Sequence, residues 1–88
     1  PNSVTDAGVG ALCARTAVIG AFLNVKINCG DCDDKTFVED ILKRGQQLVD
    51  DSCAMEDEIM EITNSKIKLC QKKWKLAQYV NLLMDILQ

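Results

Sequence analysis

The chain has 88 residues, with 13 acidic and 10 basic side chains, no histidine and a formal net charge of −3. This acidic balance argues against a nucleic-acid partner, because proteins that bind phosphate backbones present an excess of lysine and arginine. The absence of histidine removes the commonest general base and metal ligand. A chain of this length supports a modest core, so we expect one helical domain over residues 1–88 that is helped by cross-links or a partner chain.

After a polar lead-in over residues 1–6, the stretch 7–27 is the most apolar part of the chain, and its only charges are Arg15 and Lys26. Its apolar residues recur at spacings of three and four, which predicts a helix. A helix that is apolar nearly all round is usually buried. A membrane span needs about 20 apolar residues and tolerates a central arginine poorly. We therefore interpret this stretch as a buried core helix, with a membrane-active helix as the alternative.

The second predicted helix covers residues 34–51. Asn28, Gly30 and Asp31 predict a stop and a turn before it, since Asn and Gly tolerate the left-handed conformation, and the N-cap candidates are Asp31, Asp33 and Asp34. Its inward face has the 3.6-residue period of an amphipathic helix. That face consists of Phe37 or Val38, Ile41, Leu42, Gly45, Leu48 and Val49. Because Gly45 costs about 1 kcal/mol of helix propensity, we expect it to permit close packing against a neighbouring helix.

No glycine or proline follows Gly45, so the last third is also predicted to be helical. The capping residues at 50–52 predict a third helix from Cys53, and Asn64-Ser65 is the expected break before a fourth. An unbroken helix over 53–88 would exceed roughly 50 Å, against roughly 30 Å for the first helix. Either the chain folds back between residues 64 and 73, or a second chain covers the excess. Without strand signals, the prediction is an all-α fold, a small disulfide-stapled helical bundle of three to four helices.

Five cysteines in so short a chain indicate a disulfide framework and hence a secreted, extracellular protein. With the first three helices running up, down and up, we expect a Cys13–Cys53 bridge and a bridge from Cys70 to Cys29 or Cys32. One cysteine would remain free or link two chains. The C-x-x-C spacing of Cys29 and Cys32 also suggests redox chemistry, and Cys29, Cys32, Cys53 and Cys70 would meet the ligand count for zinc. Both are weaker alternatives, and neither a metal nor a cofactor is expected.

The charges are segregated along the chain. Residues 31–61 carry eleven acids and three bases, whereas five lysines surround Trp74 between residues 66 and 75. The favoured interpretation is a solvated face whose charges match the helix dipole. The alternatives are an interaction patch for an acidic partner or lipid headgroups, formed by Lys72, Lys73, Trp74 and Lys75, and antiparallel self-pairing of acidic and basic segments.

Because the sequence contains no recognisable catalytic constellation, it predicts a protein that is not an enzyme. The aliphatic, methionine-containing interior favours a secreted carrier that binds a hydrophobic small molecule or lipid between its helices, as a homo-oligomer or with a partner chain. The candidate ligand-binding residues are Leu12, Ile19, Phe22, Leu23, Phe37, Ile41, Met55, Ile59 and Met60. The alternatives are a secreted recognition module (a toxin, inhibitor or signalling subunit in a disulfide-linked or tight oligomer) and a membrane-active helical peptide.

In size, helical content and expected bridging, the chain resembles the general plan of the secretoglobins, small secreted proteins that pair and enclose an apolar ligand. The resemblance implies a fold and a mode of binding only. The pairing cysteines of that family lie near the chain ends, whereas those of this chain lie within it, so no residue role is carried over.

Overall fold

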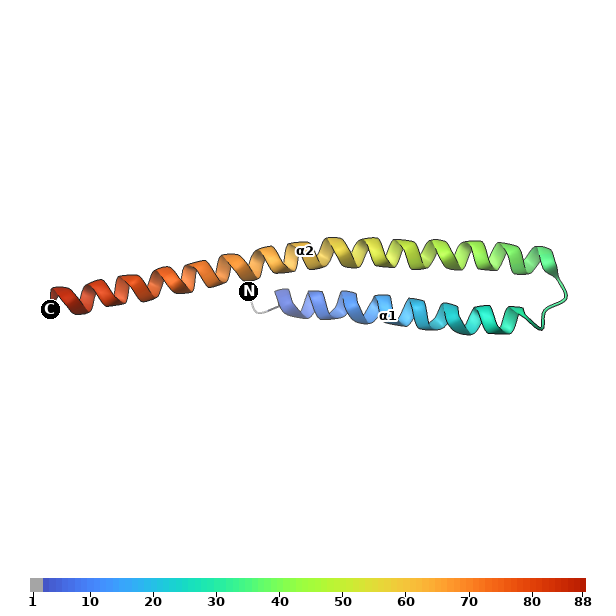
Figure 1. The fold of residues 1–88 in the computed structure, drawn as a ribbon, viewed down its shortest axis with the longest axis horizontal. Coiled ribbons are helices and arrows are strands. Elements are labelled where there is room, and N and C mark those ends of the chain that lie inside the picture. Colours follow the sequence, from blue (N-terminus) through green and yellow to red (C-terminus); the bar gives the residue numbers. More distant parts are fainter. Residues whose placement is uncertain (1–2) are drawn as a thin grey trace.

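The computed structural model describes residues 3–88, and within them the chain forms two α-helices. Helix α1 spans Val4–Cys29 and helix α2 spans Lys35–Leu87, with a short turn between them (Figure 1). Pro1 and Asn2, the start of the predicted lead-in, lie outside the described residues. The all-α prediction is confirmed. The shape is an elongated helical hairpin measuring 82 × 15 × 14 Å.

Helix α1 ends through ordinary right-handed turns. The Gly30 N–H donates to the Ile27 carbonyl oxygen at 3.3 Å, and the Cys32 N–H donates to the Cys29 carbonyl oxygen at 3.2 Å. Gly30 has φ −60° and ψ −28°, so the predicted left-handed stop is wrong. The chain then enters α2 through Asp34, whose side chain accepts a hydrogen bond from the Phe37 N–H at 3.1 Å. Of the three aspartates that were N-cap candidates, Asp34 is the N-cap of α2.

Helix α2 is continuous for 53 residues, so the prediction of three to four helices is wrong. The polar residues expected to interrupt it make their hydrogen bonds within the helix. The Gln46 and Gln47 side-chain amides donate to Asp50 and Asp51 one turn later, at 2.9 and 2.8 Å. The Ser65 hydroxyl donates to the Glu61 carbonyl oxygen at 2.9 Å. These hydrogen bonds are made within the continuous helix, and no glycine or proline follows Gly45 to end it.

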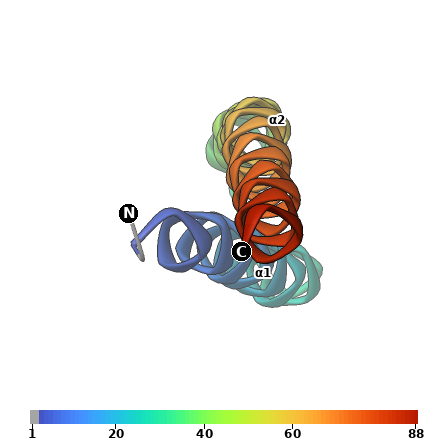
Figure 2. The same cartoon turned by 90° about the vertical axis from the view of Figure 1, so that its left-hand side faces the viewer.

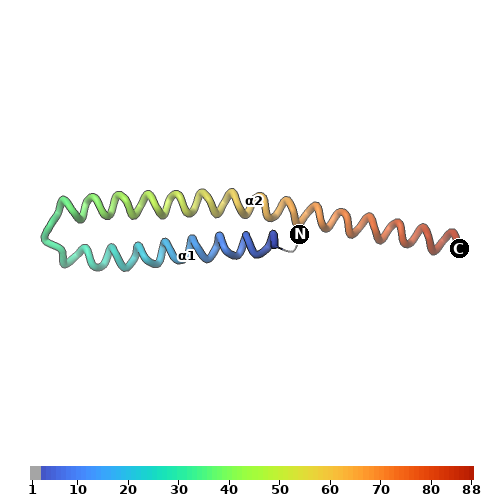
Figure 3. The backbone as a smooth tube through the Cα atoms, turned by 180° about the vertical axis from the view of Figure 1, so that it is seen from behind, coloured from blue at the N-terminus to red at the C-terminus, as the bar shows by residue number. Residues whose placement is uncertain are grey.

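The two helices run antiparallel, and α1 packs only on the first part of α2. The N-terminal end of α1 lies beside the middle of α2, and the rest of α2 projects beyond it (Figure 3). Seen along the hairpin, this projecting part comes towards the viewer past α1 (Figure 2). Every residue from 68 to 88 is exposed. The chain therefore does not fold back between residues 64 and 73, and the excess length is left uncovered.

The contact between the helices depends on two close approaches. Phe22 is the one buried hydrophobic residue among residues 3–88, with 7% of its surface exposed. A Cβ atom at Gly45 would overlap the Phe22 ring, which confirms the close packing predicted for this glycine. Lys26 covers the same ring, with its Nζ 4.5 Å from the ring centroid. Near the other end of α1, a Cβ at Gly8 would lie 3.2 Å from Cγ2 of Thr63.

The predicted disulfide staple is wrong, since all five cysteines in the described part of the chain are free. The prediction assumed that a third helix would run back beside α1. Because α2 is one rod and the start of α1 lies beside residues 62–66, Cys70 lies beyond the start of α1, whereas Cys29 and Cys32 lie at the opposite end of the hairpin. Cys13 is exposed. The extracellular location inferred from the bridges stays a prediction.

Candidate functional site

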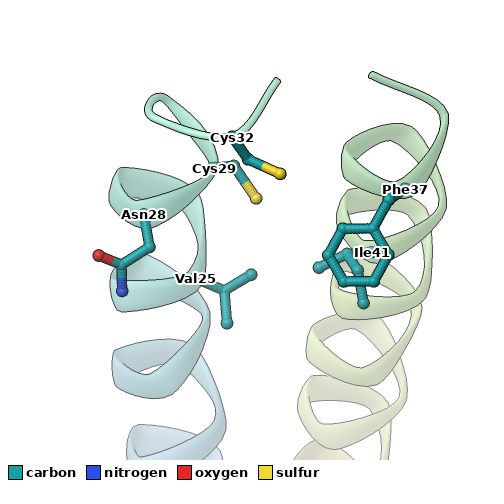
Figure 4. Close-up of a pocket in the computed structure, with 6 residues that line it drawn as sticks. All are labelled: Val25, Asn28, Cys29, Cys32, Phe37 and Ile41. Carbon is teal, nitrogen blue, oxygen red and sulfur yellow. The ribbon is translucent and has the colours of Figure 1, made fainter. Parts of the chain in front are cut away.

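Along one side of the hairpin, the described residues line four apolar hollows that follow one another between α1 and α2. The hollow nearest the turn has a volume of about 280 Å³ and is lined by Val25, Asn28, Cys29, Cys32, Phe37 and Ile41 (Figure 4). The next has a volume of about 200 Å³ and lies around Phe22 and Gly45. The remaining two have volumes of about 140 and 260 Å³ and extend to the start of α1. Together they form one shallow groove.

The walls of this hairpin groove have coiled-coil spacing. The α1 wall consists of small side chains at alternating spacings of three and four: Val4, Ala7, Ala11, Ala14, Val18, Ala21 and Val25. The α2 wall contains larger residues spaced seven apart: Ile41, Leu48, Met55 and Ile62. Alternating three and four, or seven, is the spacing at which helices pack along a continuous seam. This repeat runs across residues 50–52 and 64–65, where helix boundaries were predicted, and it was therefore not predicted.

A cross-helix ion pair lies halfway along the hairpin. Nη1 of Arg15 lies 3.4 Å from Oε2 of Glu56, and the two side chains are 40% and 8% exposed. A buried carboxylate is costly unless it is paired, so Arg15 compensates the burial of Glu56. By length and composition alone, α1 could cross a membrane, and only 11% of that apolar window is buried. In this hairpin, however, its central arginine contacts α2.

The hollow nearest the turn contains most of the reactive side chains of the groove. Cys29 and Cys32 both direct their thiols towards the space between the helices, opposite Phe37 and Ile41 (Figure 4). The alternative zinc site does not form, because within residues 3–88 no three His, Cys, Asp or Glu side chains are grouped so that they could hold a metal ion. Cys53 and Cys70 lie further along α2. The hollow thus offers one aromatic ring, aliphatic walls and two thiols, whereas the amide of Asn28 points away from α2 (Figure 4).

The predicted ligand-binding residues do not form one enclosed site. Phe22 is buried, Ile19, Ile41, Ile59 and Met60 are half-buried, and Leu12, Leu23, Phe37 and Met55 are exposed. Phe37 and Ile41 share the hollow nearest the turn, and Met55 and Ile59 share another. Leu12 and Leu23 line none of the four hollows. The predicted patch of Lys72, Lys73, Trp74 and Lys75 lies on the projecting part of α2 and is exposed.

The structure thus defines an all-α helical hairpin with a row of shallow apolar hollows between its two helices. The family model described as formiminotransferase-cyclodeaminase matches residues 1–47, which is more than half of the chain, and the chain belongs to this family. It is also 36% identical over 66 residues to a methenyltetrahydrofolate cyclohydrolase from Methylorubrum extorquens. That match covers 75% of this chain and 32% of the relative, so the chain spans about a third of the relative's length. No solved structure matches it.

Family membership corrects the predicted function. The secreted carrier, the secreted recognition module or toxin, and the membrane-active peptide are all wrong, and so is the prediction that the protein is not an enzyme. The resemblance to secretoglobins depended on bridges that do not form. The prediction that the protein is not an enzyme assumed that these 88 residues would contain a complete catalytic site. A chain that spans a third of its relative can contribute part of one.

Proposed function

We propose that this chain is the helical hairpin of an enzyme that converts a folate derivative, and that the hollow nearest the turn contacts that derivative. The observation that carries the proposal is the 36% identity to a methenyltetrahydrofolate cyclohydrolase, together with the family match over residues 1–47. The matched range 1–47 includes every residue that lines this hollow.

The chemistry of the hollow suits one part of such a ligand. A folate derivative carries a flat heteroaromatic ring, which packs well against an aromatic side chain and aliphatic walls. Phe37, Ile41 and Val25 provide these surfaces. Pockets for drug-sized ligands have volumes of roughly 300–1,000 Å³, so a hollow of about 280 Å³ accommodates a ring rather than the whole molecule.

Calorimetric titration of the 88-residue chain with methenyltetrahydrofolate tests this proposal. We expect saturable binding that Phe37→Ala weakens by about tenfold, because the variant removes an aromatic wall of the hollow. The matched control is Leu12→Ala, which also truncates an exposed apolar residue but lies outside all four hollows. Absence of saturable binding by a chain that circular dichroism shows to be helical would overturn the proposal. So would equal weakening by the two variants.

A further inference from the structure

Two of the five cysteines, Cys29 and Cys32, lie at the two ends of the turn that follows α1. The Cys32 N–H donates to the Cys29 carbonyl oxygen at 3.2 Å, so residues 29–32 form one hydrogen-bonded turn. The first and fourth residues of such a turn have Cα atoms less than about 7 Å apart. Because a disulfide needs Cα atoms about 4.4–6.8 Å apart, this turn holds the two cysteines at a separation that a disulfide can span.

The two thiols also lie on the same side of the turn. Both line the hollow nearest the turn, and both are directed towards the space between the helices (Figure 4). Cys32 is exposed, whereas Cys29 is half-buried at the end of α1. One thiol is therefore open to a reagent from solvent, and a second, less accessible thiol lies beside it.

We propose that Cys29 and Cys32 form a dithiol site whose substrate is a low-molecular-weight disulfide such as oxidised glutathione. In the first step the Cys32 thiolate attacks one sulfur of the small disulfide, and one small thiolate leaves. The Cys29 thiolate then attacks the Cys32 sulfur, and the second small thiolate leaves. The two protein thiols are oxidised to one disulfide, the small disulfide is reduced to two thiols, and the two protons pass from the protein thiols to the leaving thiolates.

This pair differs from the disulfides that the sequence predicted. Those bridges joined different helices, which the continuous α2 keeps apart, whereas Cys29 and Cys32 are joined by one turn and no helix has to move. Cys53 and Cys70 offer the contrast within the same chain. Both lie on α2, roughly 25 Å apart at 1.5 Å per residue, so they are too far apart for an internal disulfide.

The exposure of Cys32 makes the exchange reversible. Exposed disulfides are open to attack by thiols and belong to the labile class, in contrast to buried structural ones. The bridge would lie at the α1 side of the hollow, away from the contact between Phe22 and Gly45, so the helices can keep their packing. The exchange can be measured without any folate derivative, so this proposal does not require the folate proposal to be correct.

Mass spectrometry after incubation with oxidised glutathione is the first test. The Cys13→Ser/Cys53→Ser/Cys70→Ser variant should lose both thiols and about 2 Da, the two hydrogens removed, and dithiothreitol should restore both thiols. The matched control, Cys13→Ser/Cys29→Ser/Cys32→Ser, keeps two cysteines on α2 and should form glutathione adducts without an internal disulfide. Circular dichroism checks that both variants are helical. Retention of both thiols by the first variant, stable glutathione adducts on both of its cysteines, or an internal disulfide in the control would overturn the proposal.

A second test concerns the order of the two steps. When Cys29→Ser is added to the first variant, the mixed disulfide between Cys32 and glutathione should accumulate, because no second thiol displaces the glutathione. When Cys32→Ser is added instead, the half-buried Cys29 should react about threefold to tenfold more slowly, since the rate of exchange depends on access to the thiol. Equal rates for these two variants, or faster reaction of Cys29, would contradict the assignment of Cys32 as the attacking thiol.

Discussion

The two parts of α2 have similar apolar patterns and opposite environments. Residues 35–67 pack against α1 and include the close approach of Gly45 to Phe22 and the burial of Glu56. Residues 68–87 continue the seven-residue repeat with every side chain exposed. The comparison shows that the repeat specifies a surface for packing and leaves open which helix packs there. In the first part α1 is that helix, and in the second part no helix of the hairpin packs there.

The largest expected effect comes from emptying the centre of the packed part. Phe22→Ala should destabilise the chain by about 3 kcal/mol, because it removes the buried ring and leaves a cavity beside Gly45. Urea unfolding followed by circular dichroism measures this loss. Leu82→Ala, on the projecting part of α2, is the matched truncation and should change stability by less than about 0.5 kcal/mol, since Leu82 lies off the seven-residue repeat and is exposed. Equal losses would show that the two parts of α2 are equally packed.

A smaller loss of stability is expected when a side chain is added at the contact between Gly45 and Phe22 than when the Phe22 ring is removed. Gly45→Ala places a methyl group where the Phe22 ring lies, and overpacking of this kind costs about 1–3 kcal/mol. The substitution also improves helix propensity by about 1 kcal/mol, so a net destabilisation would have to come from the contact. Urea unfolding of the Gly45→Ala variant and of the Phe22→Ala/Gly45→Ala double variant, compared with Phe22→Ala, measures the coupling free energy between the two positions. In the double variant the methyl group has space and should no longer destabilise.

The Arg15–Glu56 ion pair should contribute less to the free energy of unfolding than the Phe22 ring does. Arg15→Ala leaves the buried Glu56 carboxylate without its partner and should cost about 1–2 kcal/mol, because Arg15 is partly exposed and water compensates in part. Replacing both residues by methionine should recover most of this loss, since no charge then remains at the contact. Unfolding of the two single variants and the double variant gives the coupling free energy. A coupling near zero would mean that Glu56 is adequately hydrated without Arg15.

The smallest effect is expected where the packed part of α2 begins. Asp34→Ala removes the acceptor for the Phe37 N–H and should destabilise the hairpin by about 1 kcal/mol. The readout is again the urea midpoint, with Asp33→Ala as control, because the neighbouring carboxylate makes no such contact. If both variants lose the same amount, the contribution is the general attraction of acids to the helix dipole rather than the cap.

Much of the local structure could be predicted from residue type and spacing. The helix over the apolar stretch, the Asp34 cap and the packing role of Gly45 follow from propensity, capping chemistry and periodicity. The predicted boundaries at 50–52 and 64–65 were wrong because Asp50, Asp51 and Ser65 are equally able to bond within a helix. The residue types alone do not show whether these side chains cap a new helix or form hydrogen bonds within a continuous one.

The candidate site was harder to predict. Phe37 and Ile41 were candidate ligand-binding residues, but their place beside Cys29 and Cys32 depends on how the turn brings α1 back along α2. The small residues of the α1 wall were not chosen, since alanine and valine give no chemical signal of a site. They line a groove only because Phe22, Gly8 and Gly45 hold the helices at close distance. The enzyme class came from the family match alone.

By itself, the sequence determined that this protein is helical, where its first helix lies, how its second helix begins and which faces are apolar, because these properties depend on neighbours within one or two turns. Only the tertiary structure decided that α2 is a single rod, that five cysteines stay apart or unbridged, and that Arg15 meets Glu56. The predicted bridges would have joined residues 38 to 41 positions apart in the chain, and the ion pair joins residues 41 positions apart. Their distances are fixed by the length and direction of whole helices, and no local pattern encodes them.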